Sequence, residues 1–164
     1  MGGCPAAEGS DLVDARKQAL EHFGEVLSAP MDRAAKAKEI AAAVRTSGDY
    51  RWAGIYEVDR QEIAAIAWTG ADAPAFPRFP RTQGLCGAAV ATGKTVAVGD
   101  VTKDPRYLTT FGSTRSEIVV PIPSHTAQDA IGLIDVESES LNAFGEADRA
   151  FLETCAELLS GLWE

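Results

Sequence analysis

Apolar residues recur at helical spacing in three stretches of the chain. Between residues 11 and 28 they fall every three or four positions, and the same spacing returns in residues 144–163. Residues 31–46 are rich in alanine and place Ile40 and Val44 on one stripe. We therefore predict two helices near the start of the chain and one near its end.

The middle of the chain changes to the two-residue alternation that is typical of strands. Alternate positions in residues 50–58 share one face of a predicted strand. They are Trp52, Gly54, Tyr56 and Val58. Residues 63–68 follow across a short polar turn, which predicts an antiparallel hairpin.

A long segment of mixed character follows the hairpin. Residues 69–82 contain three prolines and are predicted to be irregular. Residues 83–93 hold small residues closed by a glycine and predict a short helix. A short strand is expected at residues 95–98, and a loop or a single helical turn at residues 100–113. Segments of this kind usually cover a pocket on one face of a sheet.

Helices at both ends of a mainly antiparallel sheet predict an α+β domain. A length of 164 residues fits one domain. We assign residues 11–164 to this domain and residues 1–10, which are rich in small residues, to a flexible N-terminal tail.

Three acids interrupt the apolar runs of the last two predicted strands, in the sequence GSTRSEIVVPIPSHTAQDAIGLIDVES. Glu117 precedes a Val/Ile-rich run, and Asp135 and Glu137 lie two residues apart, on one face of a strand. One interpretation is that Asp135 and Glu137 are solvated at a strand end. The other is that all three acids face one cavity, where clustered carboxylates bind an amine or a metal, or act as a general acid or base.

Two aromatic residues and one cysteine allow similar alternatives. Trp52 and Tyr56 share a face of their strand, where they form either part of the core or an aromatic wall for a ligand. Cys86 lies near the start of the predicted short helix. It is either a small buried residue or a thiol whose pKa is lowered by the helix N-terminus.

Charge and cysteine content exclude several classes of partner. The net charge of −9 disfavours nucleic acids and anionic membranes, and no apolar run approaches the roughly 20 residues of a membrane span.

The cysteines are Cys4, Cys86 and Cys155, too few for a disulfide framework, which indicates a reducing cytoplasm. Because no Cys/His cluster has metal-ligand spacing, we expect neither a metal nor a cofactor.

Several segments together resemble one family. They are YRWAGIYEV, TQGLCGAAV, VGDVTKDPRY, GSTRSEIVVP, GLIDVES and NAFGEADRAFLE. The chain resembles the GAF domains of the free methionine-(R)-sulfoxide reductases over about residues 11–162. The resemblance implies a GAF-like (PAS-like) antiparallel sheet, with terminal helices on one face and a ligand pocket under loops on the other. It also implies a homodimer paired through the terminal helices.

The resemblance implies roles for individual residues. Glu117, Asp135 and Glu137 would receive the ammonium of a free amino acid, and Trp52 and Tyr56 would border its methyl-sulfoxide end. Thr110 and Ser116 complete the expected ligand-binding set. The candidate catalytic residues are Cys86, Glu117 and Asp135.

The chain departs from the family at its catalytic thiols. The family's nucleophilic cysteine falls on Thr110, seven residues before Glu117, and its partner falls on Phe76. Sulfoxide reduction needs a thiolate and then a second thiol, and a threonine hydroxyl supplies neither. We therefore predict that the chain binds an amine-bearing metabolite, as a sensor or a repurposed enzyme.

Two alternatives remain at this point. The first is an active reductase that uses Cys86 with an external thiol. The second is a domain that binds a cyclic nucleotide or a chromophore, which an acid-lined pocket disfavours because it repels phosphate.

Overall fold

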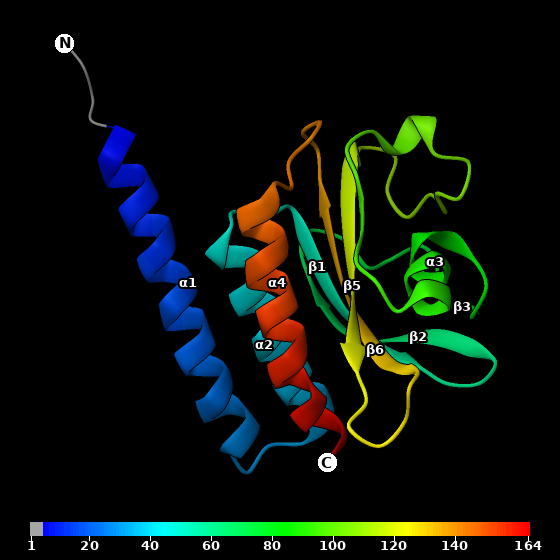
Figure 1. Ribbon diagram of the computed structural model, residues 1–164, viewed down its shortest axis with the longest axis horizontal. Coiled ribbons are helices and arrows are strands. Elements are labelled where there is room, and N and C mark those ends of the chain that lie inside the picture. Colours follow the sequence, from blue (N-terminus) through cyan, green and yellow to red (C-terminus); the bar gives the residue numbers. More distant parts are fainter. Residues whose placement is uncertain (1–4) are drawn as a thin grey trace.

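A layer of helices packs against one six-stranded antiparallel sheet in the computed structural model, which describes residues 5–164 (Figure 1). The strands are β1 (Trp52–Val58), β2 (Glu62–Thr69), β3 (Arg78–Pro80), β4 (Val96–Val98), β5 (Ser116–Pro123) and β6 (Ala130–Ser138). The helices are α1 (Pro5–Ser28), α2 (Arg33–Ser47), α3 (Gly84–Thr92) and α4 (Glu146–Leu159), with 3₁₀ turns at Val101–Lys103 and Ser160–Trp163. Their arrangement confirms the predicted α+β class.

The strand order is β3-β2-β1-β6-β5-β4. The first and last strands of the sequence therefore pair with each other in the β1–β6 ladder. The edge strands β3 and β4 have three residues each, and Pro80 ends β3. Strand β5 continues past its partner β4, and this extension contains Pro121 and Pro123. The central ladder therefore joins the predicted hairpin to the two acidic strands.

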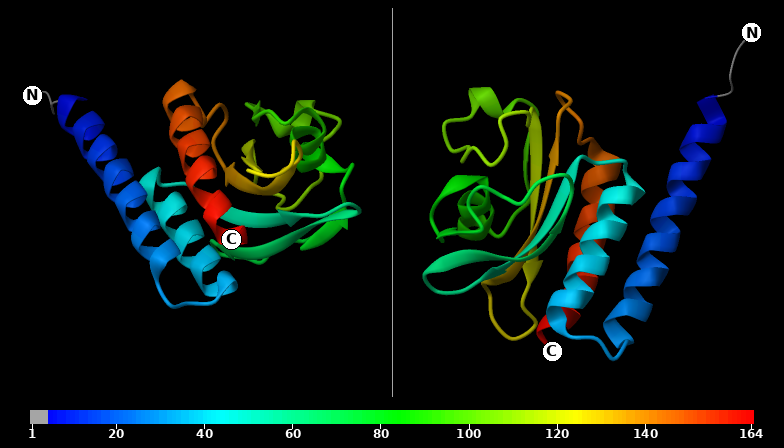
Figure 2. Two further views of the ribbon diagram at one scale, coloured as in Figure 1. Left: turned by 60° about the horizontal axis from the view of Figure 1, so that its bottom comes forward. Right: turned by 180° about the vertical axis from the view of Figure 1, so that it is seen from behind.

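Helices α2 and α4 cover one face of the sheet, and α1 packs against them on the outside (Figure 2). The main hydrophobic core lies between them and the sheet, because alternate strand residues point to the helices. Its fully buried side chains include Phe23, Ile40, Val44, Ile55, Ile118, Ile122, Ile134, Val136, Leu152 and Leu159. This layer confirms the expectation that the terminal helices share one face.

A polar network fixes α1 and α4 to the start of β1. The hydroxyl of Tyr50 donates to Asp148 Oδ1 at 2.6 Å, and Arg16 Nη2 donates to the same oxygen at 2.7 Å. The backbone N–H of Gly145 donates to Asp148 Oδ2 at 2.9 Å and so caps the N-terminus of α4. One carboxylate thus joins three segments that are far apart in the sequence.

The other face of the sheet carries α3 and the long loops (Figures 1 and 2). A second apolar cluster lies there, built from strand residues and from α3. It contains Trp52, Tyr56, Val58, Ile63, Phe79, Leu85, Cys86, Ala89, Val90, Val119 and Leu133. This position confirms that Trp52, Tyr56 and Val58 share one face.

Two boundaries differ from those predicted. Helix α1 begins at Pro5, so residues 5–10 of the expected tail are helical; proline is favoured in a first helical turn, and Ala6, Ala7 and Glu8 are good helix formers. Residues 1–4 of that tail, with Cys4, lie outside the described residues. The segment 69–82 is not wholly irregular, because β3 pairs with β2.

Among the described helices, none combines the length and the apolar character that crossing a bilayer requires.

Candidate functional site

Three buried carboxyl groups meet on the loop-covered face of the sheet. Glu117 on β5 lies directly opposite Glu137 on β6, and Asp135 lies opposite Gly54 on β1. The alternation of the strands turns all three side chains to the same face as Val119. Their exposed fractions are 4% for Glu117, 3% for Asp135 and 0% for Glu137. The interpretation of Asp135 and Glu137 as solvated acids is therefore wrong.

A narrow cavity of about 20 Å³ adjoins two of these acids. Strand, helix and loop residues line it together. They are Tyr56, Phe76, Phe79, Gly84, Leu85, Cys86, Leu108, Thr110, Glu117 and Asp135. A volume of this size holds about one water molecule. The cavity admits a larger ligand only if the loops that carry Phe76 and Thr110 move apart.

Burial raises the pKa of all three carboxyls. The pKa of Glu117 lies well above its usual value, first because of burial and then because of the charge on Asp135. Burial raises the pKa of Asp135 to about 6, although a hydrogen bond from Glu117 opposes this rise. The pKa of Glu137 rises to about 8 through burial and the Asp135 charge. The cluster therefore holds protons that ordinary carboxylates would lose.

Two carboxylate oxygens in the cluster have no hydrogen-bond partner among the described residues. They are Asp135 Oδ1 and Glu137 Oε2, and both are buried. The other oxygen of Glu137, Oε1, accepts a hydrogen bond from the Tyr107 hydroxyl at 3.4 Å. Buried polar atoms are nearly always satisfied. The Thr114 hydroxyl lies near Glu137, so Asp135 Oδ1 is the acceptor that most clearly lacks a donor among the described residues.

Cys86 completes the cluster from α3. Its sulfur lies within 4.8 Å of a carboxyl oxygen of both Glu117 and Asp135. The pKa of the thiol is raised well above its usual value, by burial first and then by the negative charges of the acids. The predicted lowering by the helix N-terminus is therefore wrong, because burial and the acids outweigh the helix end. The alternative of a buried thiol is the one found.

Aromatic rings close the cavity on its sheet side. The rings of Trp52 and Tyr56 lie 6.4 Å apart, and Phe111 packs 5.5 Å from Trp52. The indole N–H of Trp52 donates to the carbonyl of Asp72 at 3.2 Å, so this ring is tied to the covering loop. A Cβ at Gly54 would overlap the Trp52 ring, which explains the glycine between the two aromatics. Tyr56 lines the cavity itself, and Trp52 supports it.

The structure separates one predicted residue from the site. Ser116 lies on the opposite face of β5, where its hydroxyl donates to the Ser140 carbonyl at 2.6 Å and accepts from the N–H of Ala143 at 3.3 Å. Because adjacent strand residues point to opposite faces, Ser116 cannot share a cavity with Glu117. Its assignment to ligand binding is therefore wrong. Thr110 does line the cavity.

Several residues of the site gave no clear signal in the sequence. Phe79 packs edge to face on Tyr56 at a centroid distance of 6.1 Å, and Leu108 lines the cavity. Tyr107 contacts Glu137 as described above. All three lie in segments without a periodic pattern, where only their large side chains among small and polar neighbours distinguish them.

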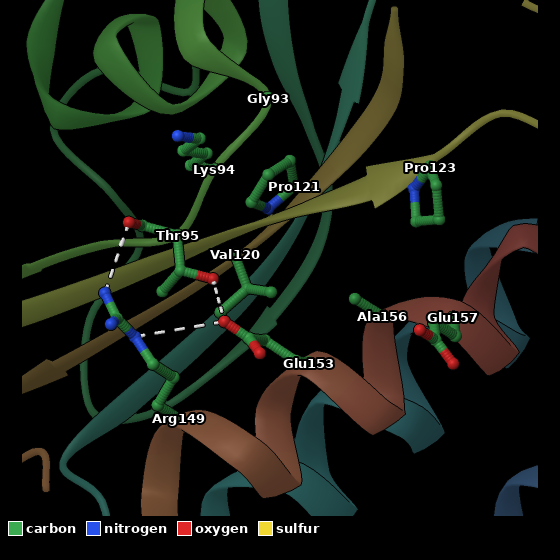
Figure 3. Close-up of a pocket in the computed structure, with 10 residues that line it drawn as sticks. All are labelled: Gly93, Lys94, Thr95, Val120, Pro121, Pro123, Arg149, Glu153, Ala156 and Glu157. Atoms are coloured by element: carbon green, nitrogen blue, oxygen red, sulfur yellow. Dashed lines mark hydrogen bonds and ion pairs between the residues drawn. The ribbon is translucent and has the colours of Figure 1, made fainter. Parts of the chain in front are cut away.

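A larger groove of about 470 Å³ lies away from this cluster, where β5 runs past β4 beside α4 (Figure 3). Three of its polar residues, Thr95, Arg149 and Glu153, are bonded to one another. Thr95 Oγ1 donates to Glu153 Oε1 at 2.7 Å, and Arg149 Nη2 donates to the Thr95 carbonyl at 3.4 Å. The groove is open and holds no buried charge, so the acidic cavity is the stronger candidate.

Comparisons with known proteins identify relatives over most of the chain. A family model of the GAF domain matches residues 32–162. The GAF domain-containing protein A of Dictyostelium discoideum is 31% identical over 141 residues, which cover 85% of this chain and 87% of that protein. The free methionine-R-sulfoxide reductase of Saccharomyces cerevisiae is 35% identical over 115 residues, which cover 68% of this chain and 62% of the yeast protein.

Solved structures of related proteins share the fold of this chain. The free methionine-R-sulfoxide reductase of Neisseria meningitidis, in complex with its substrate, superimposes with a TM-score of 0.81 at 33% identity. That superposition covers 90% of this chain and 87% of the Neisseria chain.

Proposed function

Because the chain belongs to the GAF domain family and is homologous to free methionine-R-sulfoxide reductases, we propose that it binds a small amine-bearing metabolite in the acidic cavity. The best candidate is a free amino acid or a compound that resembles methionine sulfoxide. The buried Asp135 Oδ1, which lacks a donor among the described residues, carries this proposal.

An ammonium group supplies what this oxygen lacks. It brings three N–H donors and one positive charge, and the cluster offers Glu117, Asp135 and Glu137 as acceptors. A charge-assisted hydrogen bond in a buried site is stronger than a neutral one. Among the described residues that line the cavity, none is basic. A bound ammonium would therefore add a positive charge beside Glu117 and Asp135 and favour their ionised forms.

Once the loops that carry Phe76 and Thr110 have moved apart, the apolar residues beside the acids suit a short side chain. Tyr56, Phe79, Leu85 and Leu108 surround the space beside the acids. Aromatic faces also attract the partial positive charge of a sulfoxide sulfur or methyl group. We therefore place the amine at the acids and the ligand side chain among these residues.

The proposal does not include the reduction of a sulfoxide by two cysteine thiols. Phe76 and Thr110 line the cavity at the positions that the resemblance gives to two cysteines, and Cys86 is the remaining thiol there. The raised pKa of Cys86 disfavours the thiolate that would attack a sulfoxide sulfur. The protein would accordingly act as a sensor, or as an enzyme that uses the carboxyl groups as acid and base.

A reductase that works through Cys86 is the second candidate, since its sulfur lies beside the acids. An ammonium bound among the carboxylates would offset their charge and so favour the thiolate. An external thiol would then have to complete the redox cycle.

Calorimetric titration with methionine-(R)-sulfoxide and methionine tests the proposal. We expect one amine-bearing ligand per chain, and loss of binding in Asp135→Asn and Glu137→Gln. The exposed Glu21→Gln serves as the matched control. Binding that persists in both cavity variants would exclude the acids as the amine site.

Single-turnover assays with methionine-(R)-sulfoxide and dithiothreitol distinguish the two candidates. Binding without turnover favours the sensor or repurposed enzyme. Turnover that disappears in Cys86→Ser supports the reductase.

A further inference from the structure

We infer that Cys86, Glu117 and Asp135 form a binding site for a thiophilic divalent cation, with Zn²⁺ as the best fit. The inference concerns a second ligand for the same cavity and does not depend on the amine proposal. It rests on the positions of three donor atoms and on one buried oxygen that lacks a partner.

The donor atoms come from three separate elements. The sulfur of Cys86 comes from α3, one carboxyl oxygen from Glu117 on β5 and one from Asp135 on β6, and all lie within 4.8 Å of one another. Ligand atoms around a tetrahedral Zn²⁺ lie about 3.5 Å apart, given metal–ligand distances of about 2.1–2.3 Å. The three donor atoms lie within 4.8 Å of one another, so metal binding would require them to move closer together.

A second feature of the cluster favours a cation: one buried carboxyl oxygen has no hydrogen-bond partner in the part of the chain that the structure describes. Asp135 is 3% exposed, and its Oδ1 has no hydrogen-bond partner among the described residues. This oxygen belongs to a side chain that lines the cavity of about 20 Å³. A metal ion would satisfy this oxygen.

The donor set selects the class of metal. One thiolate with two carboxylates suits Zn²⁺, which accepts sulfur and oxygen ligands together. Mg²⁺ and Ca²⁺ prefer oxygen ligands alone, and Cu(I) prefers soft sulfur ligands. Zn²⁺ would displace the proton from the Cys86 thiol, and this proton would pass to the buffer together with any proton held between the two carboxyls.

The sequence interpretation predicted no metal because no cysteine or histidine ligands are close together along the chain. Cys86 and Asp135 are separated by much of the domain, and only the fold brings them together. The site would overlap the amine position, since both ligands need Asp135 and Glu117. Zn²⁺ and an amine would therefore compete.

Metal titration of EDTA-treated, desalted protein tests this inference, with a phosphine in place of thiol reductants. Calorimetry with Zn²⁺ should give one site per chain. Cd²⁺ should produce an ultraviolet sulfur-to-metal charge-transfer band. Cys86→Ser should abolish the band and weaken Zn²⁺ binding more than about tenfold, since even outer-shell changes cost that much. Asp135→Asn should weaken binding similarly.

Two other thiols provide matched controls. Cys155→Ser removes a buried thiol from the helical layer, and Cys4→Ser removes the thiol outside the described residues. Both should keep the band and the affinity. A band that is absent from the wild-type protein, or that disappears in either control, would overturn the inference.

Titration of the same proteins with methionine separates this inference from the proposed function. Amine binding without metal binding rejects the zinc site alone. Metal binding without amine binding supports the zinc site and rejects the amine proposal. If both bind, saturating Zn²⁺ should block the amine in the wild-type protein but not in Cys86→Ser; simultaneous binding in the wild-type protein would contradict a shared site.

Discussion

Glu117 and Glu137 face each other directly across the β5–β6 ladder, and both side chains are buried. Like charges at directly opposed positions destabilise an antiparallel pair. The protein relieves part of this repulsion by keeping protons on the acids, whose pKa values are raised. The stability of the fold is therefore linked to the protonation of these carboxyl groups.

The first prediction concerns stability as a function of pH. Glu137 has a pKa of about 8 in the folded state and about 4.5 in the unfolded state, so the folded state binds its proton more tightly. The stability that this proton provides is complete below the unfolded value and is lost as the pH rises through the folded value. We expect the free energy of unfolding to fall by about 2 kcal/mol between about pH 6 and pH 8.5.

Urea unfolding in the presence of EDTA measures this loss. Glu137→Gln carries no charge at this position, so its stability should fall less over the same range. The exposed Glu21→Gln should follow the wild-type protein. A wild-type stability that rises over this range would contradict the assigned proton.

The second prediction concerns the protons released on ligand binding. An ammonium binds best to ionised carboxylates, and Asp135 and Glu137 have pKa values of about 6 and about 8. Affinity for methionine should therefore increase from pH 6 to pH 8, while its amine is still protonated. Titrations in two buffers with different ionisation enthalpies should show proton release near neutral pH. Equal binding enthalpies in both buffers would show that no proton is released, and so that the acids are already ionised.

The third prediction restores a thiol to the cavity. Thr110 lines the same cavity as Cys86, so Thr110→Cys places a second sulfur there. We expect this variant to gain turnover of methionine-(R)-sulfoxide. One thiol would attack the sulfoxide sulfur, take up its oxygen as a sulfenic acid and release methionine. The second thiol would then form a disulfide with the loss of water. A thioredoxin-coupled assay detects the gain. Thr109→Cys, on the exposed neighbouring residue, should stay inactive; equal activity in both variants would show that the position does not matter.

The fourth prediction concerns the polar network between the helices. Asp148 accepts hydrogen bonds from Tyr50 and Arg16 and caps α4. Asp148→Asn keeps the shape but removes the charge, and should lower the free energy of unfolding by about 1–3 kcal/mol. Urea unfolding measures this, with Glu146→Gln in the same helical turn as the control. An unchanged stability would mean that the network adds little to the fold.

Local pattern predicted most of the elements but not their exact limits. The β-rich residues of β1 and β2 and the short polar turn between them identified the hairpin, although β1 is buried on both faces. The three-residue strand β3 was missed, since its pairing depends on the position of β2 and not on its own residues. The early start of α1 was missed because glycine and serine in residues 9–10 obscured the favourable first turn.

The two-residue alternation of a strand correctly placed Asp135 and Glu137 on one face. The same alternation requires Ser116 to point away from Glu117, and the family resemblance led us to assign Ser116 to the site. The high pKa of Cys86 could not be predicted, since it depends on acids from other strands. Which residues share a cavity is a property of the sheet register, and a single strand does not contain that information.

The prolines at the sheet edges affect how copies of this protein meet. Pro80, Pro121 and Pro123 remove backbone donors at or near the outer strands, and β3 and β4 are too short to offer a long template. Strand addition from a neighbouring molecule is therefore disfavoured on both sides of the sheet. The short, proline-bearing edges should therefore make the fold resist fibrous aggregation through edge-to-edge strand pairing.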